Sequence, residues 1–208
     1  MQKDPPVSSH HPISADAHGP DGLDTDAAVP TQRLFFALWP SEQSAREIMA
    51  WARDAHAAFG GRMMRPETLH LTLAFLGSTP ADRTSELVSA AASWPAAVQA
   101  VTLRRFGRFT GPRIVWAGPS EGESHTPAWL DDLYDALWGR LERHGWERPP
   151  GVFRPHVSLL RKAEPGDVSV LQRPPLTWMP AGCVLVASQP REGGSHYQVL
   201  ARMPLRTA

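Results

Sequence analysis

The sequence lacks the features that would mark a disulfide-stabilised, membrane-spanning or dinucleotide-binding protein. Its single cysteine, Cys183, excludes an internal disulfide, and its apolar flanks predict a buried thiol. No stretch is long and apolar enough to cross a bilayer, and residues 1–31 show no basic segment followed by an apolar one, as a secretion signal would. Neither a Walker loop nor a glycine-rich turn after a strand is present. We therefore expect a cytoplasmic protein that is not associated with a membrane.

The chain also lacks a net charge, because its 21 basic residues balance its 21 acidic residues. The balance is uneven along the sequence: residues 1–31 hold one base and five acids, which leaves +4 for the remainder. Domains that bind an extended nucleic acid usually show a basic patch or a pI above about 9. The small positive excess is compatible with a small anionic substrate or with a single RNA end.

Two regions differ in composition. Residues 1–31 are rich in Pro, Ser, His, Asp and Gly and carry no periodic apolar pattern, which predicts a disordered tail with solvated histidines. Residues 32–208 contain the apolar runs and form one domain, long enough to bury a core in two lobes.

Short apolar runs alternate with helical periodicities from Arg33 onward. The runs predict strands at Arg33–Trp39, Leu69–Leu76, Val98–Phe106, Arg113–Ala117, Val157–Leu160, Cys183–Ser188 and His196–Met203. Capping residues and apolar spacing predict helices from Ser41 to Gly60, from Thr79 to Ser93, and from Thr126 to His144. We expect an α+β fold with two pseudo-symmetric lobes, each an antiparallel sheet with helices on its outer face, lining a central groove.

A four-residue pattern occurs twice, as HLTL from His70 and as HVSL from His156, 86 residues later. Both copies lie in predicted strands, where side chains at positions i and i+2 share one face. Each copy therefore presents an imidazole beside a hydroxyl, from Thr72 in the first and Ser158 in the second. A single strand histidine is usually structural, but two such embedded copies are harder to attribute to chance.

Two imidazoles that face each other could cleave a phosphodiester. One would deprotonate a water molecule and the other would protonate the leaving oxygen, since histidine titrates near neutral pH. The two hydroxyls would donate hydrogen bonds to the non-bridging oxygens. Two histidines without nearby cysteines or carboxylates make a poor zinc site, so we expect neither a metal nor another cofactor.

These residues belong to a larger resemblance. The sequence is similar to the two-histidine phosphoesterase superfamily, and within it to the LigT-like RNA 2′,3′-cyclic phosphodiesterases. The similarity runs in order from Arg33 to Leu205. The blocks that carry it are Arg33–Leu38, Leu69–Gly77, Ile114–Gly118, Pro155–Arg161, Ser188, Tyr197 and Met203–Leu205.

The resemblance implies a metal-independent enzyme that opens an RNA-terminal 2′,3′-cyclic phosphate to a 2′-phosphomonoester. His70 would donate a proton to the departing 3′ oxygen and His156 would activate water, although a symmetric site could exchange the two roles. Thr72 and Ser158 would hold the phosphate; serine stands at the second position where the family usually has threonine. Arg161 would face the phosphate, although in a regular strand it would point away from the side chain of Ser158.

The expected substrates are RNA 3′ ends or cyclic nucleotides, handled by a monomer with no obligate protein partner. The aromatic residues Phe36, Trp39 and Trp116 could stack a terminal base, but core packing is the more usual role for each. Three alternatives remain open: ligation of RNA ends through a 2′-5′ bond by the reverse chemistry, a non-catalytic domain that binds RNA ends, and a fold in which both histidines are structural.

Overall fold

The computed structural model describes residues 30–119, 126–191 and 194–207. The predicted tail lies outside the described residues except for its last two, and the first strand begins at Thr31, so the boundary between residues 31 and 32 stays a prediction. The helices are α1 (Glu42–Phe59), α2 (Ala81–Ala91) and α3 (Ala128–Arg143), with short 3-10 turns η1 (Pro66–Thr68) and η2 (Val168–Val170). The strands are β1 (Thr31–Pro40), β2 (Arg62–Met63), β3 (Leu71–Pro80), β4 (Ala96–Val98), β5 (Val101–Leu103), β6 (Arg105–Phe109), β7 (Ile114–Gly118), β8 (Val157–Arg161), β9 (Leu176–Trp178), β10 (Pro180–Arg191), β11 (Gly194–Met203) and β12 (Leu205–Thr207).

One eight-stranded sheet connects the two lobes. Its strand order is β11-β10-β1-β3-β8-β7-β6, with β2 paired to the side of β8. All of its pairings are antiparallel. The strands β3 and β8 pair through only one residue each, Leu71 opposite Val157. The sheet therefore divides at this contact into a four-stranded part and a part formed by β2, β6, β7 and β8, and the predicted two-lobed α+β architecture is confirmed.

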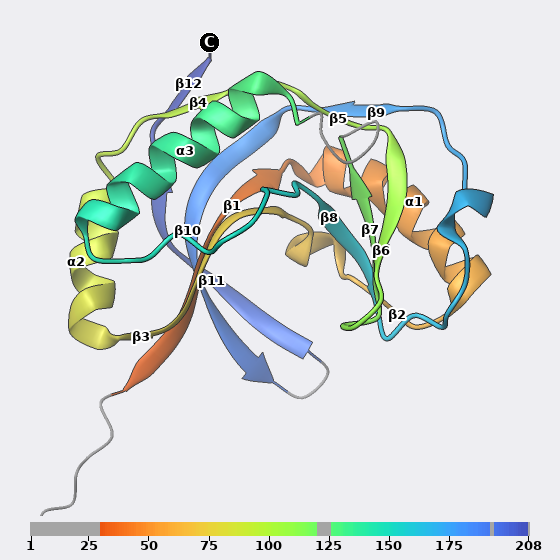
Figure 1. Ribbon diagram of the computed structural model, residues 1–208, viewed down its shortest axis with the longest axis horizontal. Coiled ribbons are helices and arrows are strands. Elements are labelled where there is room, and N and C mark those ends of the chain that lie inside the picture. The colour runs from red at the N-terminus through yellow and green to blue at the C-terminus, as the bar shows by residue number, and fades with distance from the viewer. Residues whose placement is uncertain (1–29, 120–125, 192–193, 208) are drawn as a thin grey trace, which may run out of the picture.

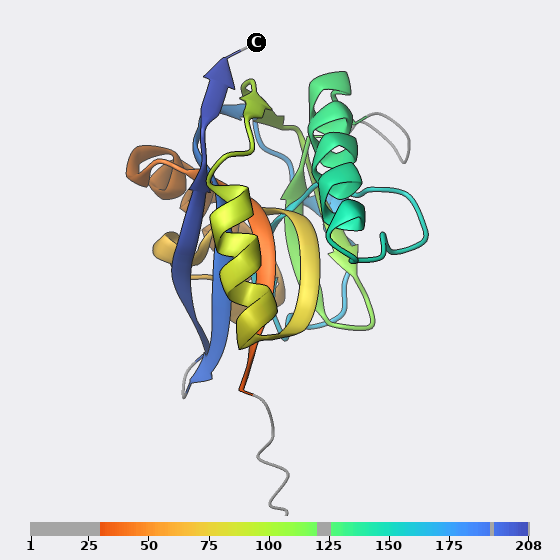
Figure 2. The same cartoon turned by 90° about the vertical axis from the view of Figure 1, so that its left-hand side faces the viewer.

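The lobes are not consecutive halves of the chain. Helix α1, which follows β1 in sequence, packs on β8 in the other lobe, whereas α2 packs on β1, β3 and β11. Figure 1 shows α1 beside β6, β7 and β8, with α2 and α3 on the opposite side of the molecule. In Figure 2, α2 lies in front of the strands of the four-stranded part. Each lobe therefore combines segments from both ends of the domain.

Strand β1 is buried on both of its faces. Leu34, Phe36 and Leu38 belong to the main core, which lies on the side of the helices. The alternate residues Phe35 and Ala37 point the other way, into a smaller cluster with Val184 and Val186 of β10. This alternation follows from the two-residue period of a strand. It places Phe36 in the core, the more usual role expected for this residue, and excludes it from base stacking.

The helices begin and end where the sequence predicts within about two residues. The Ser41 side chain caps α1 by accepting a hydrogen bond from the backbone N–H of Ser44 at 3.1 Å, and Gly60 ends the helix at a φ of 56°. None of the helices in the described ranges is long and apolar enough to cross a membrane.

The segment predicted as one strand at Val98–Phe106 is instead three short strands. Its parts pair with three different partners: β4 with β12, β5 with β9, and β6 with β7. A pattern of alternating apolar residues predicts extended backbone. It does not predict where the extended chain leaves one neighbouring strand and pairs with another.

Leu71 is fully buried at the one contact between β3 and β8. We expect Leu71→Ala to lower the free energy of unfolding by about 2–5 kcal/mol, because the deletion removes buried methyl groups and leaves a cavity. Urea denaturation measures this loss. The control is Val152→Ala, at a position that is 75% exposed, which should change stability by no more than about 0.5 kcal/mol. A loss below about 1 kcal/mol at Leu71 would show that this contact is not part of the packed core.

Candidate functional site

The two motif histidines occupy equivalent places in the fold. His70 immediately precedes β3 and His156 immediately precedes β8. Leu71 and Val157 face each other and are fully buried in the main core, so the residues on either side of them point to the opposite face of the sheet. We call this the site face; it carries His70, Thr72, His156 and Ser158, all half-buried.

The register also sets how these four side chains lie relative to one another. Continuing the pairing on either side of Leu71 and Val157 places His70 across from Ser158 and Thr72 across from His156. The two histidines are then diagonal neighbours, and residues at such positions lie roughly 7–8 Å apart in a regular antiparallel pair, with their Cβ atoms somewhat closer. The sequence-predicted pairs therefore come together on one surface, each imidazole beside a hydroxyl from its own strand and another from the opposite strand.

Each motif strand contains a β-bulge at the third residue after its histidine. In β3 the extra residue is Leu73, because its two neighbours pair with consecutive residues of β1. In β8 the extra residue is Leu159, because its neighbours pair with consecutive residues of β7. An extra residue shifts the alternation of side chains by one position. The residue after each leucine is therefore also buried in the core.

The bulges return the fifth residue after each histidine to the site face. Arg161, an odd step from Ser158, therefore lies on the same side as that residue, where a regular strand would have turned it away. The equivalent position in the first lobe holds Phe75, which is 52% exposed and lies with its ring 5.4 Å from the guanidinium carbon of Arg33. A charged group and an aromatic ring thus occupy matching places in the two lobes.

The same backbone hydrogen bond orients both imidazoles. Nδ1 of His70 lies 2.7 Å from the carbonyl oxygen of Thr68, and Nδ1 of His156 lies 2.8 Å from that of Arg154. A carbonyl oxygen can only accept, so Nδ1 must carry the hydrogen in each ring. In the neutral form each Nε2 then has a free lone pair, ready to take a proton. Fixing the tautomer through the other ring nitrogen is a common way to position a working histidine.

Aromatic rings surround His70. The Trp39 ring stacks on the imidazole at 5.3 Å with an interplanar angle of 10°, and Tyr197 meets it edge-on at 5.4 Å. Phe35 lies 4.9 Å away on the same face. Burial among these groups lowers the pKa of His70 to about 4, with smaller contributions from the charges of His156 and Arg161; the hydrogen bond to Thr68 acts in the opposite direction. His70 is therefore neutral in the free protein near pH 7.

His156 lies in a less enclosed aromatic setting. Phe109 meets its ring edge-on at 4.9 Å, and Trp116 lies 6.0 Å away. The Trp116 ring covers Gly107 so closely that a Cβ there would lie 2.0 Å from it, so the glycine is needed for this arrangement. Burial and the charge of Arg161 lower the pKa of His156, but by less than at His70.

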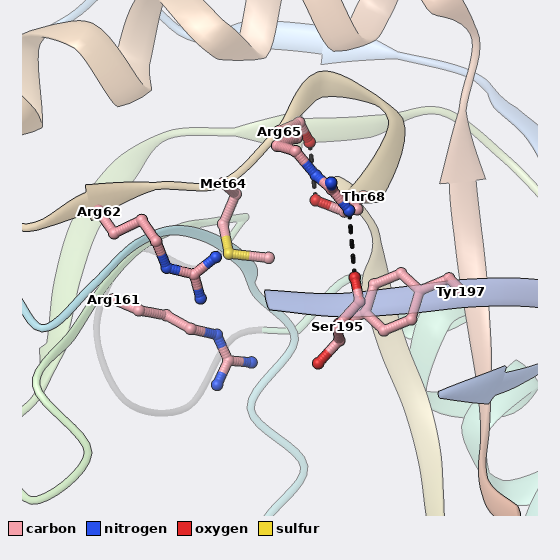
Figure 3. A pocket seen from close by; sticks show the side chains of 7 residues that line it. All are labelled: Arg62, Met64, Arg65, Thr68, Arg161, Ser195 and Tyr197. Carbon is pink, nitrogen blue, oxygen red and sulfur yellow. Dashed lines mark hydrogen bonds between the residues drawn. The ribbon is translucent and has the colours of Figure 1, made fainter. Parts of the chain in front are cut away.

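Two hollows are lined by residues that contact the histidines. One is a cavity of about 330 Å³ next to Phe109 and Trp116, whose remaining lining includes Phe153 and the arginines Arg105, Arg108 and Arg154. The other is a small pocket lined by Arg62, Met64, Arg65, Thr68, Arg161, Ser195 and Tyr197 (Figure 3). Two residues of its lining, Thr68 and Tyr197, also contact His70.

Sequence reasoning identified the four motif residues and Arg161 but missed several neighbours. Arg62 and Arg65 belong to a short segment without a periodic pattern, and Phe109 lies between two predicted strands, where the structure has the end of β6. The carbonyl groups that orient the imidazoles leave no signal in the sequence, because every residue has one. Within the described ranges, no group of three or more His, Cys, Asp or Glu side chains is placed to hold a metal ion.

Comparisons with known proteins agree with this architecture. A family model described as LigT like Phosphoesterase matches residues 38–116. The RNA 2′,3′-cyclic phosphodiesterase of Escherichia coli K12 is 30% identical over 176 residues, which is 84% of this chain and 97% of that protein. The protein of the same name from Thermus thermophilus is 29% identical and covers 84% of this chain and 90% of its own length.

Solved structures of the same group share the fold. The crystal structure of E. coli LigT complexed with 3′-AMP superposes with a TM-score of 0.69 at 29% identity, covering 85% of this chain and 99% of that one. E. coli LigT complexed with phosphate gives a TM-score of 0.64 at 28% identity, covering 86% and 99% of the respective chains. Similarity of sequence and of fold across nearly the whole length of these proteins leads to one conclusion: the chain belongs to the LigT-like phosphoesterase family.

Proposed function

We propose that this protein hydrolyses RNA-terminal 2′,3′-cyclic phosphates to 2′-phosphomonoesters by acid–base catalysis with His70 and His156, without a metal ion. The observation that carries the proposal is the placement of two imidazoles on one face, each held by Nδ1 so that Nε2 is free. The relatives' name, RNA 2′,3′-cyclic phosphodiesterase, supports the same reaction. A cytoplasmic location and a monomeric state stay predictions.

The proposed reaction proceeds by in-line displacement at phosphorus. One Nε2 removes a proton from water, whose oxygen forms a new bond to phosphorus. The bond from phosphorus to the 3′ oxygen breaks, and the other imidazole, protonated at Nε2, gives its proton to that oxygen. Thr72 and Ser158 donate hydrogen bonds to the non-bridging oxygens, where negative charge increases in the transition state. Arg161 adds a fixed positive charge on the same face.

The protonation states of the two imidazoles depend on whether the substrate is bound. The reaction requires one neutral and one protonated imidazole, yet both pKa values are lowered in the free protein. A phosphate anion bound between the rings raises both pKa values by favouring the charged form. In the free protein, His156 holds a proton more readily than His70, whereas the family resemblance makes His70 the donor. The substrate would have to reverse that order, so the assignment of the two roles stays a prediction.

A non-catalytic RNA-end binder would not need two imidazoles oriented with free Nε2 atoms.

The 330 Å³ cavity beside Trp116 suits an unpaired base, because aromatic side chains and arginines can stack against such a base. In the same proposal, ligation through a 2′-5′ bond would use the same groups, with a 5′ hydroxyl in place of water as the nucleophile that displaces the 3′ oxygen. Incubation with cleaved tRNA halves would reveal a joined product.

Replacing either histidine removes half of the acid–base pair. We expect His70→Ala and His156→Ala each to lower kcat for a 2′,3′-cyclic phosphate by about 10²–10⁴-fold in EDTA, with the circular dichroism spectrum unchanged. Phosphorus NMR of the product identifies the 2′-phosphomonoester. His56→Ala, at an exposed position of α1, is the matched control and should keep full activity. Full activity in either motif variant would overturn the mechanism.

The pH dependence follows from the two lowered pKa values. Below about pH 4 both imidazoles of the free protein are protonated and no base remains; above the pKa of His156, which lies under 6.5, both are neutral and no acid remains. The profile of kcat/KM should therefore be bell-shaped with its maximum between about pH 4 and 6.5, and the profile of kcat should lie at higher pH. Trp39→Leu, which opens the surroundings of His70, should move the acidic limb upward. A kcat/KM maximum above pH 7.5 would contradict this account.

The hydroxyl at Ser158 should contribute to the transition state. We expect Ser158→Ala to lower kcat by about 10–10²-fold, since it removes one donor to the developing charge. Ser158→Thr restores the residue usual in the family and should keep kcat within about threefold, because the hydroxyl is retained and its rotamer is more restricted. Steady-state kinetics of the two variants separate these outcomes, and full activity of Ser158→Ala would exclude the proposed contact.

A further inference from the structure

Two residues other than glycine adopt the left-handed backbone conformation within the described ranges, and a hydrogen bond joins them. Arg113 ends the turn between β6 and β7 with a φ of 54°, and Lys162 directly follows β8 with a φ of 56°. This conformation costs free energy, because the Cβ atom of an L-residue crowds the following carbonyl oxygen. Residues of this kind persist only where their surroundings hold them, and they cluster at functional sites.

Arg113 supplies contacts that hold the segment after β8. Its Nε donates a hydrogen bond to the carbonyl oxygen of Ala163 at 3.1 Å. Its Nη2 donates to the carboxylate of Glu164 at 2.6 Å and lies 3.5 Å from the carbonyl oxygen of Lys162. In return, the backbone N–H of Ala163 donates to the carbonyl oxygen of Arg113 at 3.0 Å. One residue of the β6–β7 turn therefore contacts three consecutive residues after β8.

The ion pair with Glu164 is the weaker part of this arrangement. The side chain of Arg113 is 47% exposed and that of Glu164 is 69% exposed, so water screens their attraction. The hydrogen bonds to the backbone determine the path of the chain more strictly, because a guanidinium is planar and donates in fixed directions. We therefore expect the shape of the Arg113 side chain to matter more than its charge.

The segment after β8 is also supported from two other elements. A Cβ at Gly61, the residue before β2, would lie 2.8 Å from the carbonyl oxygen of Arg161 and 2.8 Å from Cα of Ala163. The backbone N–H of Glu164 donates a hydrogen bond to the carbonyl oxygen of Phe59, at the end of α1, at 2.8 Å. The β6–β7 turn is therefore one of three supports that fix the chain where it leaves β8.

Both segments that Arg113 joins carry neighbours of His156. Arg161 immediately precedes Lys162, and its charge lowers the pKa of both motif histidines. Phe109, the last residue of β6, immediately precedes the turn and meets the His156 ring edge-on at 4.9 Å. The contacts of Arg113 thus link the cationic neighbour of this imidazole to its aromatic one.

We propose that Arg113 is a positioning residue: by holding Lys162 in its left-handed conformation, it keeps the guanidinium of Arg161 directed toward the two imidazoles. Arg113 acts through the backbone and not through contact with the substrate. Its effect on catalysis rests on the proposed function, in which Arg161 acts on the phosphate. Its effect on the position of Arg161 is independent of turnover.

NMR titration of the histidine side chains tests the positioning without a substrate. Arg161→Ala removes a positive charge and should raise the pKa of both His70 and His156. Arg113→Ala should raise both pKa values as well, because the guanidinium of Arg161 is then no longer held near the rings. In the Arg161→Ala background, Arg113→Ala should add no further rise. Unchanged pKa values in Arg113→Ala, or a rise that adds fully to that of Arg161→Ala, would overturn the inference.

Matched variants separate positioning from charge and from a general loss of stability. Arg148→Ala deletes an arginine with similar bonds, to the carboxylate of Asp135 at 2.8 Å and to its carbonyl oxygen at 3.5 Å, and should leave both pKa values unchanged. Arg113→Lys keeps the charge but not the planar fork, so it should still raise both; it also carries the test if Arg113→Ala does not fold. Full retention of the original pKa values in Arg113→Lys would contradict positioning by the guanidinium.

Kinetics connect the position of Arg161 to the reaction. We expect Arg113→Ala to lower kcat/KM for a 2′,3′-cyclic phosphate by about 10–10²-fold, since small displacements in a site cost that much. Combined with Arg161→Ala, it should cause no further loss, because the two residues act as one unit. Additive losses would reject the inference while leaving the proposed reaction intact. If the pKa values change as expected but the unaltered protein hydrolyses no cyclic phosphate, the proposed reaction fails and the positioning stands.

Discussion

The antiparallel contact between Leu71 and Val157 determines the geometry of everything proposed for this site. Both side chains enter the core, so strand alternation turns the residues before and after them to the other face. Two strands from distant parts of the chain thereby present the same pair of groups to one surface. Because β3 and β8 pair at only this point, the lobes meet there without closing the surface that the imidazoles face.

Electrostatics then distinguishes two sites that the backbone makes nearly equivalent. The same carbonyl hydrogen bond holds both histidines, but Trp39, Tyr197 and Phe35 enclose His70 more fully, and its pKa is lowered further. The bulges add a second asymmetry, with Arg161 on one side and Phe75 on the other. A substrate that carries both a phosphate and a base would meet different surroundings in the two lobes, which gives a pseudo-symmetric fold a preferred direction of binding.

The sequence contains the local information from which much of this could be predicted. The two motifs, the cap at Ser41 and the apolar faces of the helices follow from short-range patterns, and these predictions agree with the structure. The bulges at Leu73 and Leu159 could not be predicted, because each depends on how a neighbouring strand pairs. Arg161 shows the consequence: strand alternation alone turns it away from Ser158, and only the bulge returns it. The contacts of Arg113 likewise join two segments whose proximity is a property of the tertiary fold.

The central claim is that one phosphorus atom lies between the two imidazoles. A crystal structure of the complex with a nucleoside 2′-phosphate, the proposed product, tests it most directly. The account predicts Nε2 of His70 and Nε2 of His156 on opposite sides of one phosphate group, each about 2.6–3.2 Å from one of its oxygens. A phosphate that contacts a single imidazole, or that lies away from both, would contradict it.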